Sequence, residues 1–195
     1  TWAEPAKFID DVYYRSDGGG YTQKGFSQLF SIDANGGNAK QLTHDEFDNA
    51  GDVSFSNDGK SLYFSANRHT NNQLKFTNNE IYKLDLASQT ITEITKRDGP
   101  DEQPKVSPDG RYLAYTGYDD KRTNYENAQL YIRDLKTGNT TSLTPNFDRS
   151  VGQIKWSANS KGVYFSYADK GQTALAYQPR SGKRKIITTQ IGSVA

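Results

Sequence analysis

A tight hairpin that recurs at a fixed spacing limits the fold of this chain more than any other feature. The clearest copy is Ser107–Pro108–Asp109–Gly110, which lies between two short runs of apolar residues. Proline presets φ at the second position of a type I turn, and glycine takes the positive φ that completes the turn. The turn serines of the three copies are Ser56, Ser107 and Ser157, 51 and 50 residues apart. A period in this range indicates a repeat architecture.

The two flanking copies of the hairpin are imperfect. Asn57 stands where the first copy would have proline, and Gly59 follows as in the central copy. Ser160 stands where the last copy would have glycine. We expect a tight turn in both copies, because Asn, Asp and Ser favour turns as well.

Two more strands follow each hairpin, so that a complete unit has four. The third strand is an apolar and aromatic run that ends in aspartate, and the fourth ends in threonine after a polar turn. The third strands are expected at 29–33, 81–85 and 130–134, and the fourth at 39–43, 90–95 and 140–144. A weaker copy of this half runs from 175 to 188. Four short strands per unit are typical of a propeller blade.

The repeats predict an all-β fold: a β-propeller of four-stranded antiparallel blades, with nearly four blades covered as an open arc by residues 1–195. The expected blades span about 8–43, 51–95, 102–144 and 151–188. The first blade has three evident strands, beginning with one over 8–15, and residues 190–195 are expected to lead to a strand that is not present. An open arc exposes sheet edges and apolar blade faces. We therefore expect self-association through these edges, or contact with the remaining blades of a larger ring.

Composition fits this fold and excludes several partners. Only 33% of the residues are hydrophobic, but 12% are aromatic, so apolar area is concentrated in a few large side chains. With 24 basic and 23 acidic residues the net charge is +1, which predicts no nucleic-acid partner. No apolar run is long enough to span a membrane, so no membrane insertion is expected. The lack of cysteine leaves the cellular compartment open.

No motif in the sequence assembles an active site. Gly25–Leu29 comes nearest to a G-x-S-x-G nucleophile elbow, but it lacks the last glycine and a following helical pattern. His44 and His69 lie in different units, each without a second ligand-type residue at metal spacing. The carboxylates between the blades do not match a calcium-binding loop, and we expect them to accept hydrogen bonds from backbone amides. We therefore predict no catalytic residue, no cofactor and no metal in this chain.

Three polar insertions join the second and third strands of successive units. They are 16–26, 67–79 and 119–127. Because they occupy the same place in the repeat, we expect them on one face of the propeller, where loops often carry function. Insertions that are merely tolerated at the surface are the alternative.

The hairpins resemble a known propeller repeat. Ser-Pro-Asp-Gly-Arg at 107–111, Ser-Asn-Asp-Gly-Lys at 56–60 and Leu-Tyr-Ile-Arg-Asp-Leu at 130–135 look like the repeat shared by Tol-Pal-type periplasmic propellers and prolyl-oligopeptidase-family peptidases. A second set of segments is similar to the acylaminoacyl-peptidase-like branch of that family: 14–21, 64–68, 97–101, 114–120 and 148–152. The resemblance covers essentially the whole chain, with its elements in the expected order.

The resemblance implies a propeller that caps a C-terminal α/β-hydrolase domain carrying a Ser-Asp-His triad. That domain is absent from this sequence, so no catalytic residue can be carried over and the chain is expected not to be an enzyme by itself. The implied function is to gate and position short peptides for the missing hydrolase domain of a serine peptidase. We assign the gating to Tyr21, Arg68, Arg122 and Tyr125, because cations and aromatic rings at a tunnel mouth can hold a peptide.

Localisation and function both leave alternatives. The start at Trp2–Pro5 looks like family members exported to the periplasm, so a periplasmic or secreted protein is expected, with the cytoplasm as the alternative. The rival function is a stand-alone periplasmic propeller that docks other proteins, like that of the Tol-Pal system. A sugar-processing propeller with its own metal site is a third reading, which two isolated histidines disfavour.

Overall fold

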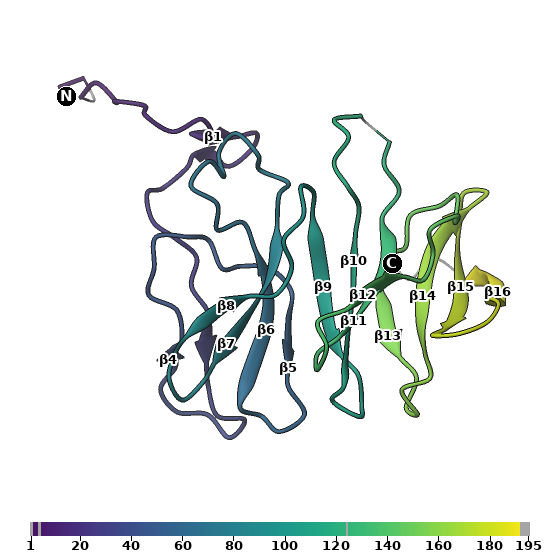
Figure 1. Cartoon of the computed structure of the whole chain (residues 1–195). Helices are drawn as coiled ribbons and strands as arrows, with labels where there is room; N and C mark the ends of the chain where they lie inside the picture. The colour runs from purple at the N-terminus through teal and green to yellow at the C-terminus, as the bar shows by residue number, and fades with distance from the viewer. Residues whose placement is uncertain (1, 4, 124, 192–195) are drawn as a thin grey trace.

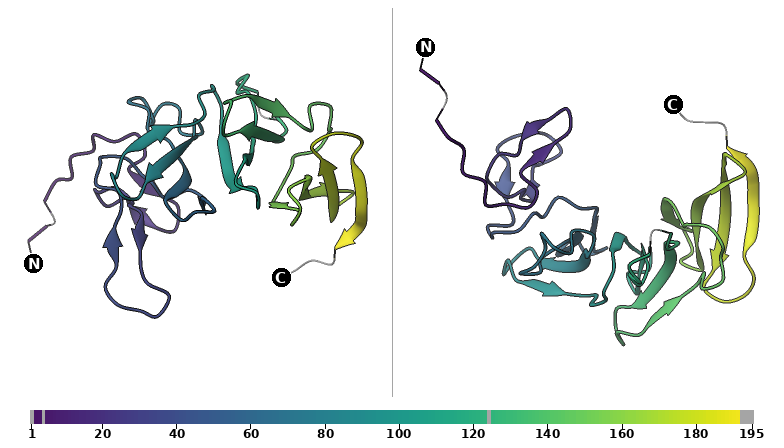
Figure 2. Two further views of the ribbon diagram at one scale, coloured as in Figure 1. Left: turned by 60° about the horizontal axis from the view of Figure 1, so that its bottom comes forward. Right: turned by 90° about the horizontal axis from the view of Figure 1, so that it is seen from above.

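The computed structural model describes residues 2, 3, 5–123 and 125–191, and in this part of the chain every regular element is a β-strand. Three four-stranded antiparallel sheets and two two-stranded ribbons follow one another along the chain (Figure 1). Seen from above, the sheets stand side by side along an open arc (Figure 2). The predicted all-β propeller arc is therefore confirmed.

Each four-stranded sheet is one blade, with its strands in chain order from one edge to the other. Blade 2 comprises β5 (Val53–Phe55), β6 (Ser61–Ala66), β7 (Glu80–Asp85) and β8 (Ile91–Glu93). Blade 3 comprises β9 (Asp101–Val106), β10 (Tyr112–Gly117), β11 (Gln129–Asp134) and β12 (Thr140–Ser142). Blade 4 comprises β13 (Ile154–Trp156), β14 (Gly162–Asp169), β15 (Gln172–Pro179) and β16 (Lys185–Ile191). In blade 4 only Lys170 and Gly171, both at positive φ, join the second and third strands.

The first unit is less complete than the others. Its third and fourth strands are the short ribbon β3 (Phe30–Ser31) and β4 (Lys40–Gln41), and a separate hairpin forms from β1 (Arg15–Ser16) and β2 (Gly20–Tyr21). The strand predicted over 8–15 is wrong except at Arg15, because residues 8–14 belong to no strand of the structure. The predicted connector 190–195 falls largely on 192–195, outside the described residues.

The recurrent hairpin turns form as their residues predict. Gly59, Gly110 and Ser160 have φ of 67°, 73° and 57°, and the amide of each donates to the carbonyl of the turn serine three residues earlier. A positive φ is unusual for serine. At Ser160 the hydroxyl oxygen accepts a hydrogen bond from the Asp109 amide at 3.0 Å, so this residue also joins blade 4 to blade 3.

The threonines that end the fourth strands have a common role. Each is buried, and its Oγ1 accepts a hydrogen bond from the amide at the start of the third strand of the same unit. The pairs are Leu29 to Thr43 at 2.9 Å, Ile81 to Thr95 at 2.8 Å and Leu130 to Thr144 at 2.8 Å. The hydroxyl therefore satisfies a backbone donor at the place where ladder pairing of the two strands stops.

Apolar side chains lie between the blades rather than inside any one of them. Tyr63 and Ile81 of blade 2 pack against Leu113 and Tyr115 of blade 3, all nearly inaccessible to solvent. A larger cluster fills the space between blades 3 and 4, and it includes the indole of Trp156. Because a thin sheet has two faces to cover, each blade depends on both neighbours for its core.

Charged side chains are buried at the junction of blades 2 and 3. Glu80 is fully buried, and its carboxylate accepts hydrogen bonds from Thr95 Oγ1 and the Arg97 amide, both at 2.6 Å. The Arg97 guanidinium pairs with the buried Asp101 and lies 4.2 Å from the ring centroid of Tyr131. These contacts tie the end of one blade to the first strand of the next.

Burial changes the acidity of the two carboxyls in this junction. Desolvation raises the pKa of Glu80 to about 7, although the hydrogen bonds from Thr95 and Arg97 oppose the rise. Desolvation raises the pKa of Asp101 to about 6, against the charge of Arg97. Glutamine occupies the place of Glu80 in the two neighbouring units, at Gln28 and Gln129. The repeat therefore accepts an uncharged side chain of the same shape at this place.

These pKa values predict a pH-dependent stability. Glu80 binds its proton more tightly in the folded than in the unfolded chain, so protonation favours folding. Its contribution is present below about pH 4.5 and is lost as pH rises through about 7. Between pH 5 and 8 we expect the free energy of unfolding to fall, by up to about 3 kcal/mol from Glu80. Glu80→Gln should remove most of this slope in urea unfolding followed across that range.

Glu46→Gln is the matched control, because it removes one carboxyl from an exposed position. This control should keep the slope of the unmodified chain, to which Asp101 contributes with the same sign. Equal slopes for the unmodified chain and Glu80→Gln would contradict the assignment.

Candidate functional site

The three polar insertions lie at the same end of their sheets, at the top of Figure 1, and we call this face of the arc the loop end. They are the β1–β2 region 16–26, the β6–β7 loop 67–79 and the β10–β11 loop 119–127, with Asn124 outside the described residues. Antiparallel pairing makes every connection from a second to a third strand leave the same end of its sheet. Gln73 Nε2 donates to Asp11 Oδ1 at 3.0 Å, and Lys75 pairs with Asp98 at 2.8 Å. The loop 67–79 therefore bridges the N-terminal segment and the entrance to blade 3.

Arg68, the first cation of this loop, is engaged at the junction of the first unit with blade 2. Its Nη2 pairs with Asp45 Oδ2 at 2.9 Å, and its Nη1 donates to Oδ1 of the fully buried Asn49 at 2.7 Å. The guanidinium also lies 4.9 Å from the ring centroid of Phe47 and 5.4 Å from that of Tyr82. Only 14% of the Arg68 side chain is exposed. The structure therefore gives Arg68 a structural role between blades.

The other three predicted gating residues are exposed. Tyr21 pairs with Arg15 in the β1–β2 hairpin, and the Lys7 ammonium lies 4.2 Å from its ring centroid. Arg122 and Tyr125 belong to the β10–β11 loop, where 83% of the Tyr125 side chain is accessible. The Arg122 backbone is fixed at φ 59°, with its amide donating to Asp120 Oδ1 at 2.6 Å. Two different insertions thus present these three side chains.

A polar cleft of about 930 Å³ opens between the N-terminal segment and the loop 67–79. Its lining includes Asp11, Glu46, Asp48 and His69. Asp48 Oδ1 accepts a hydrogen bond from the Ser27 amide at 2.7 Å, which is the role predicted for the carboxylates between blades. Nε2 of His69 is buried and, among the described residues, has no hydrogen-bond partner.

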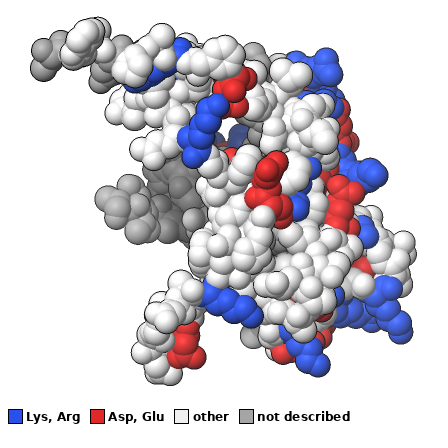
Figure 3. All heavy atoms as spheres, turned by 90° about the vertical axis from the view of Figure 1, so that its left-hand side faces the viewer, with Lys and Arg blue, Asp and Glu red and all other residues white. Residues whose placement is uncertain are grey.

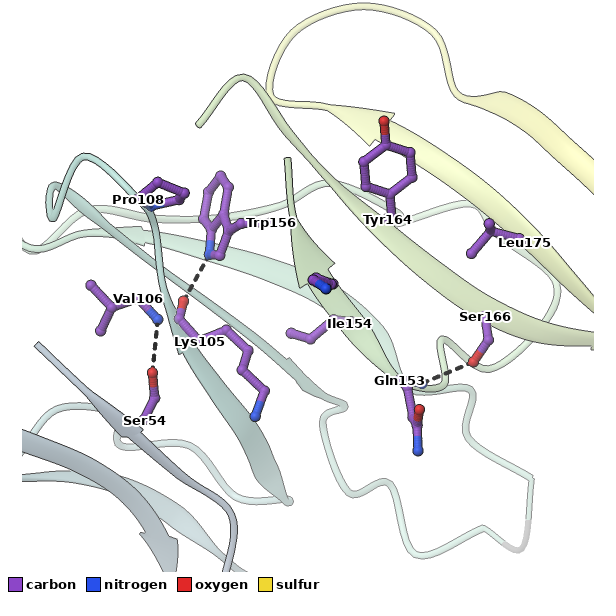
Figure 4. Close-up of a pocket in the computed structure, with 11 residues that line it drawn as sticks. Ser54, Lys105, Val106, Pro108, Gln153, Ile154, Trp156, Tyr164, Ser166 and Leu175 are labelled. Atoms are coloured by element: carbon purple, nitrogen blue, oxygen red, sulfur yellow. Dashed lines mark hydrogen bonds between the residues drawn. The ribbon is translucent and has the colours of Figure 1, made fainter. Parts of the chain in front are cut away.

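A second cleft, of about 850 Å³, follows the first strands β5, β9 and β13, which contact one another across the blades (Figure 4). Trp156 Nε1 donates to the Lys105 carbonyl at 2.8 Å, so the indole closes the space between blades 3 and 4. Tyr164 and Leu175 extend the lining onto the face of blade 4 that no other blade of the described residues covers. No pattern in the sequence indicates this cleft, because it depends on how the blades are placed.

The charges at the surface show no field of a single sign on the face drawn in Figure 3, where blue and red atoms are interspersed among uncharged ones. Within the described residues, no three His, Cys, Asp or Glu side chains lie where they could hold a metal ion. Nor does the described part contain a helix long and apolar enough to cross a membrane. The loop end thus presents exposed aromatic rings, cations and a polar cleft.

The junction carboxyls are the feature that sequence reasoning missed. Glu80 replaces a glutamine of the repeat, and this substitution is the signal that could have identified it. In the sequence Arg68 is a cation within an insertion, and its position alone does not indicate that Asp45 and Asn49 bind it. Both cases depend on a partner in a different unit.

Residues 19–123, more than half of the chain, match the family described as dipeptidyl peptidase IV (DPP IV) N-terminal region. Dipeptidyl-peptidase 5 of Porphyromonas gingivalis is 34% identical over 142 residues, which cover 70% of this chain and 20% of that protein. The chain thus spans about a fifth of the length of this curated relative.

Two solved structures share the fold. TolB from Acinetobacter baumannii superposes with a TM-score of 0.65 and 26% identity, covering 83% of this chain and 37% of that one. Dipeptidyl peptidase 4 of Porphyromonas gingivalis superposes with a TM-score of 0.52 and 15% identity, covering 76% of this chain and 26% of that one. The predicted resemblance to the propellers of this peptidase group is confirmed, and the chain belongs to the dipeptidyl peptidase IV N-terminal region family.

Proposed function

We propose that this chain forms part of the propeller of a serine peptidase and helps to gate and position short peptides for an α/β-hydrolase domain. The observation that carries the proposal is the family match over 19–123, which covers most of the first insertion of the loop end, all of the second and just over half of the third. The exposed Tyr21, Arg122 and Tyr125 support a role in contacting peptides. An acylaminoacyl-peptidase-like preference for blocked N-terminal residues is the finer part of the proposal.

The chemistry assigned to this chain is binding. Its sequence contains no G-x-S-x-G motif, so the nucleophile would come from the hydrolase domain. An exposed tyrosine can pack on a peptide through its ring, and an arginine can pair with a carboxylate in a bidentate way. Tyr125 and Arg122 lie on the same loop and could hold two parts of one peptide.

Labelling with a fluorophosphonate probe tests this function. The probe reacts with activated serine nucleophiles, so the full-length gene product should be labelled and this chain alone should not. Labelling that disappears when the serine of the downstream G-x-S-x-G is changed to alanine would identify the nucleophile. A full-length product that remains unlabelled would contradict the peptidase assignment.

A docking module is the second candidate, and the likeness to TolB favours it. At 26% identity and 83% coverage, TolB matches more of this chain than the dipeptidyl peptidase 4 structure does. In this reading the loop end would hold another protein rather than a short peptide. An unlabelled full-length product that captures a defined protein partner would support this candidate.

The exposed insertion residues should affect peptide selectivity in the full-length enzyme. We expect Arg122→Ala and Tyr125→Ala to change kcat/KM by different factors for peptides of different length and charge, while the thermal stability stays within about 1 °C, because surface substitutions of this kind change stability little. The measurement is kcat/KM across a peptide panel. Unchanged ratios across the panel would remove these residues from the gating proposal.

Arg68 should behave differently because of its buried contacts. Arg68→Met keeps much of the side-chain volume but leaves Asp45 and Asn49 without their cation, so we expect a loss of about 2–4 kcal/mol in unfolding free energy. Arg122→Met, the same change at an exposed position, is the control and should cost little. Equal stability of the two variants would contradict the structural role of Arg68.

A further inference from the structure

The N-terminal segment 8–14 exposes an unusual amount of apolar surface. Phe8, Val12 and Tyr13 are 85%, 62% and 72% accessible, and the start of the chain extends away from the sheets (Figure 2). On the first strand of blade 2, Val53 and Phe55 are 43% and 55% accessible. Two exposed apolar surfaces in neighbouring units suggest that each belongs against another part of the chain.

The sequence of this segment matches the second strand of a blade. Val12–Tyr13–Tyr14 has the pattern of Leu62–Tyr63–Phe64 on β6 and of Val163–Tyr164–Phe165 on β14. Its spacing also matches, because Val12 lies 17 residues before Leu29, and Leu113 of β10 lies 17 residues before Leu130. In the order of the sequence, therefore, this segment corresponds to the second strand of a complete blade.

The complete blades define the pairing that this segment would adopt. In blade 2, Leu62 lies opposite Leu84, Tyr63 opposite Lys83 and Phe64 opposite Tyr82. Blade 3 has the same register, with Leu113 opposite Arg133 and Tyr115 opposite Tyr131. Transferred to the first unit, this register places Val12 opposite Ile32, Tyr13 opposite Ser31 and Tyr14 opposite Phe30.

This register would also cover the exposed side of blade 2. Val53 and Phe55 pair with Phe64 and Leu62, so their side chains lie on the sheet face that is directed toward the first unit. In blade 2, Tyr63 packs with Leu113 and Tyr115 of the following blade. Tyr13 occupies the place of Tyr63 in the repeat and would lie on the same kind of surface, against Phe55.

We propose that residues 11–16 form a strap with two positions. In the open position, which the structure shows, the strap is held by a short hairpin ladder with Gly20 and Tyr21 and by hydrogen bonds with Gln73. In the closed position it pairs with 28–33 as the second strand of the first unit. Because Asp11 and Tyr13 line the polar cleft, closure removes part of its wall and so changes the access to the loop end.

Disulfide trapping tests the closed position directly, because the natural chain contains no cysteine. Tyr13→Cys combined with Ser31→Cys should form an intrachain disulfide under mild oxidation, with loss of both free thiols. Tyr13→Cys combined with Ile32→Cys is the control for register, since a shift of one residue places the two side chains on opposite faces. Only the first pair should form its disulfide rapidly.

Lys83→Cys combined with Thr92→Cys is the positive control, because these residues lie opposite each other on β7 and β8. If this control pair forms its disulfide while the variant with Tyr13→Cys and Ser31→Cys keeps its free thiols, the closed position of the strap does not exist. Equal rates for the two strap pairs would also overturn the proposal, since they would indicate a mobile segment without a defined register. Hydrogen exchange of the chain without cysteine gives an independent measurement: slow exchange at 12–15 is expected, and exchange as fast as at 7–9 counts against closure.

Discussion

The structure depends on burial between adjacent blades. A four-stranded sheet has two apolar faces, and the side chains of Phe64, Leu113 and Phe165 become inaccessible only because a neighbouring sheet covers them. The contacts that fix this stacking recur with the repeat: Asn57 donates to the Ser107 carbonyl, Asp109 to Ser160 and Trp156 to Lys105, each across about one period of sequence. The stability of each blade therefore depends on the contacts with its neighbours, as in other repeat proteins.

Much of this fold follows from local rules that can be applied to the sequence. The turns at Gly59 and Gly110 require a residue that accepts positive φ, and the sequence supplies it at a constant interval. The threonines at the ends of the fourth strands are equally regular. The same rules predict a strand over 8–15, but a strand forms only where a partner strand pairs with it, and propensity does not provide that partner.

The candidate site was less predictable, because its properties come from contacts between units. Arg68 and Arg122 look alike in the sequence, as cations within polar insertions. In the structure, Arg68 is enclosed by Asp45, Asn49 and two aromatic rings, whereas Arg122 remains at the surface. The acidity of Glu80 likewise depends on its enclosure between two blades. Neither difference is encoded within a few residues of the side chain concerned.

The connection between β14 and β15 gives the loop end an asymmetric outline. The first three units each place an insertion there, whereas blade 4 turns back after Lys170 and Gly171. The loops therefore project beyond the sheets over the first three units, and only a two-residue turn does so over blade 4. A molecule that lies across the loop end would therefore have less protein surface to contact above blade 4 than above the first three units.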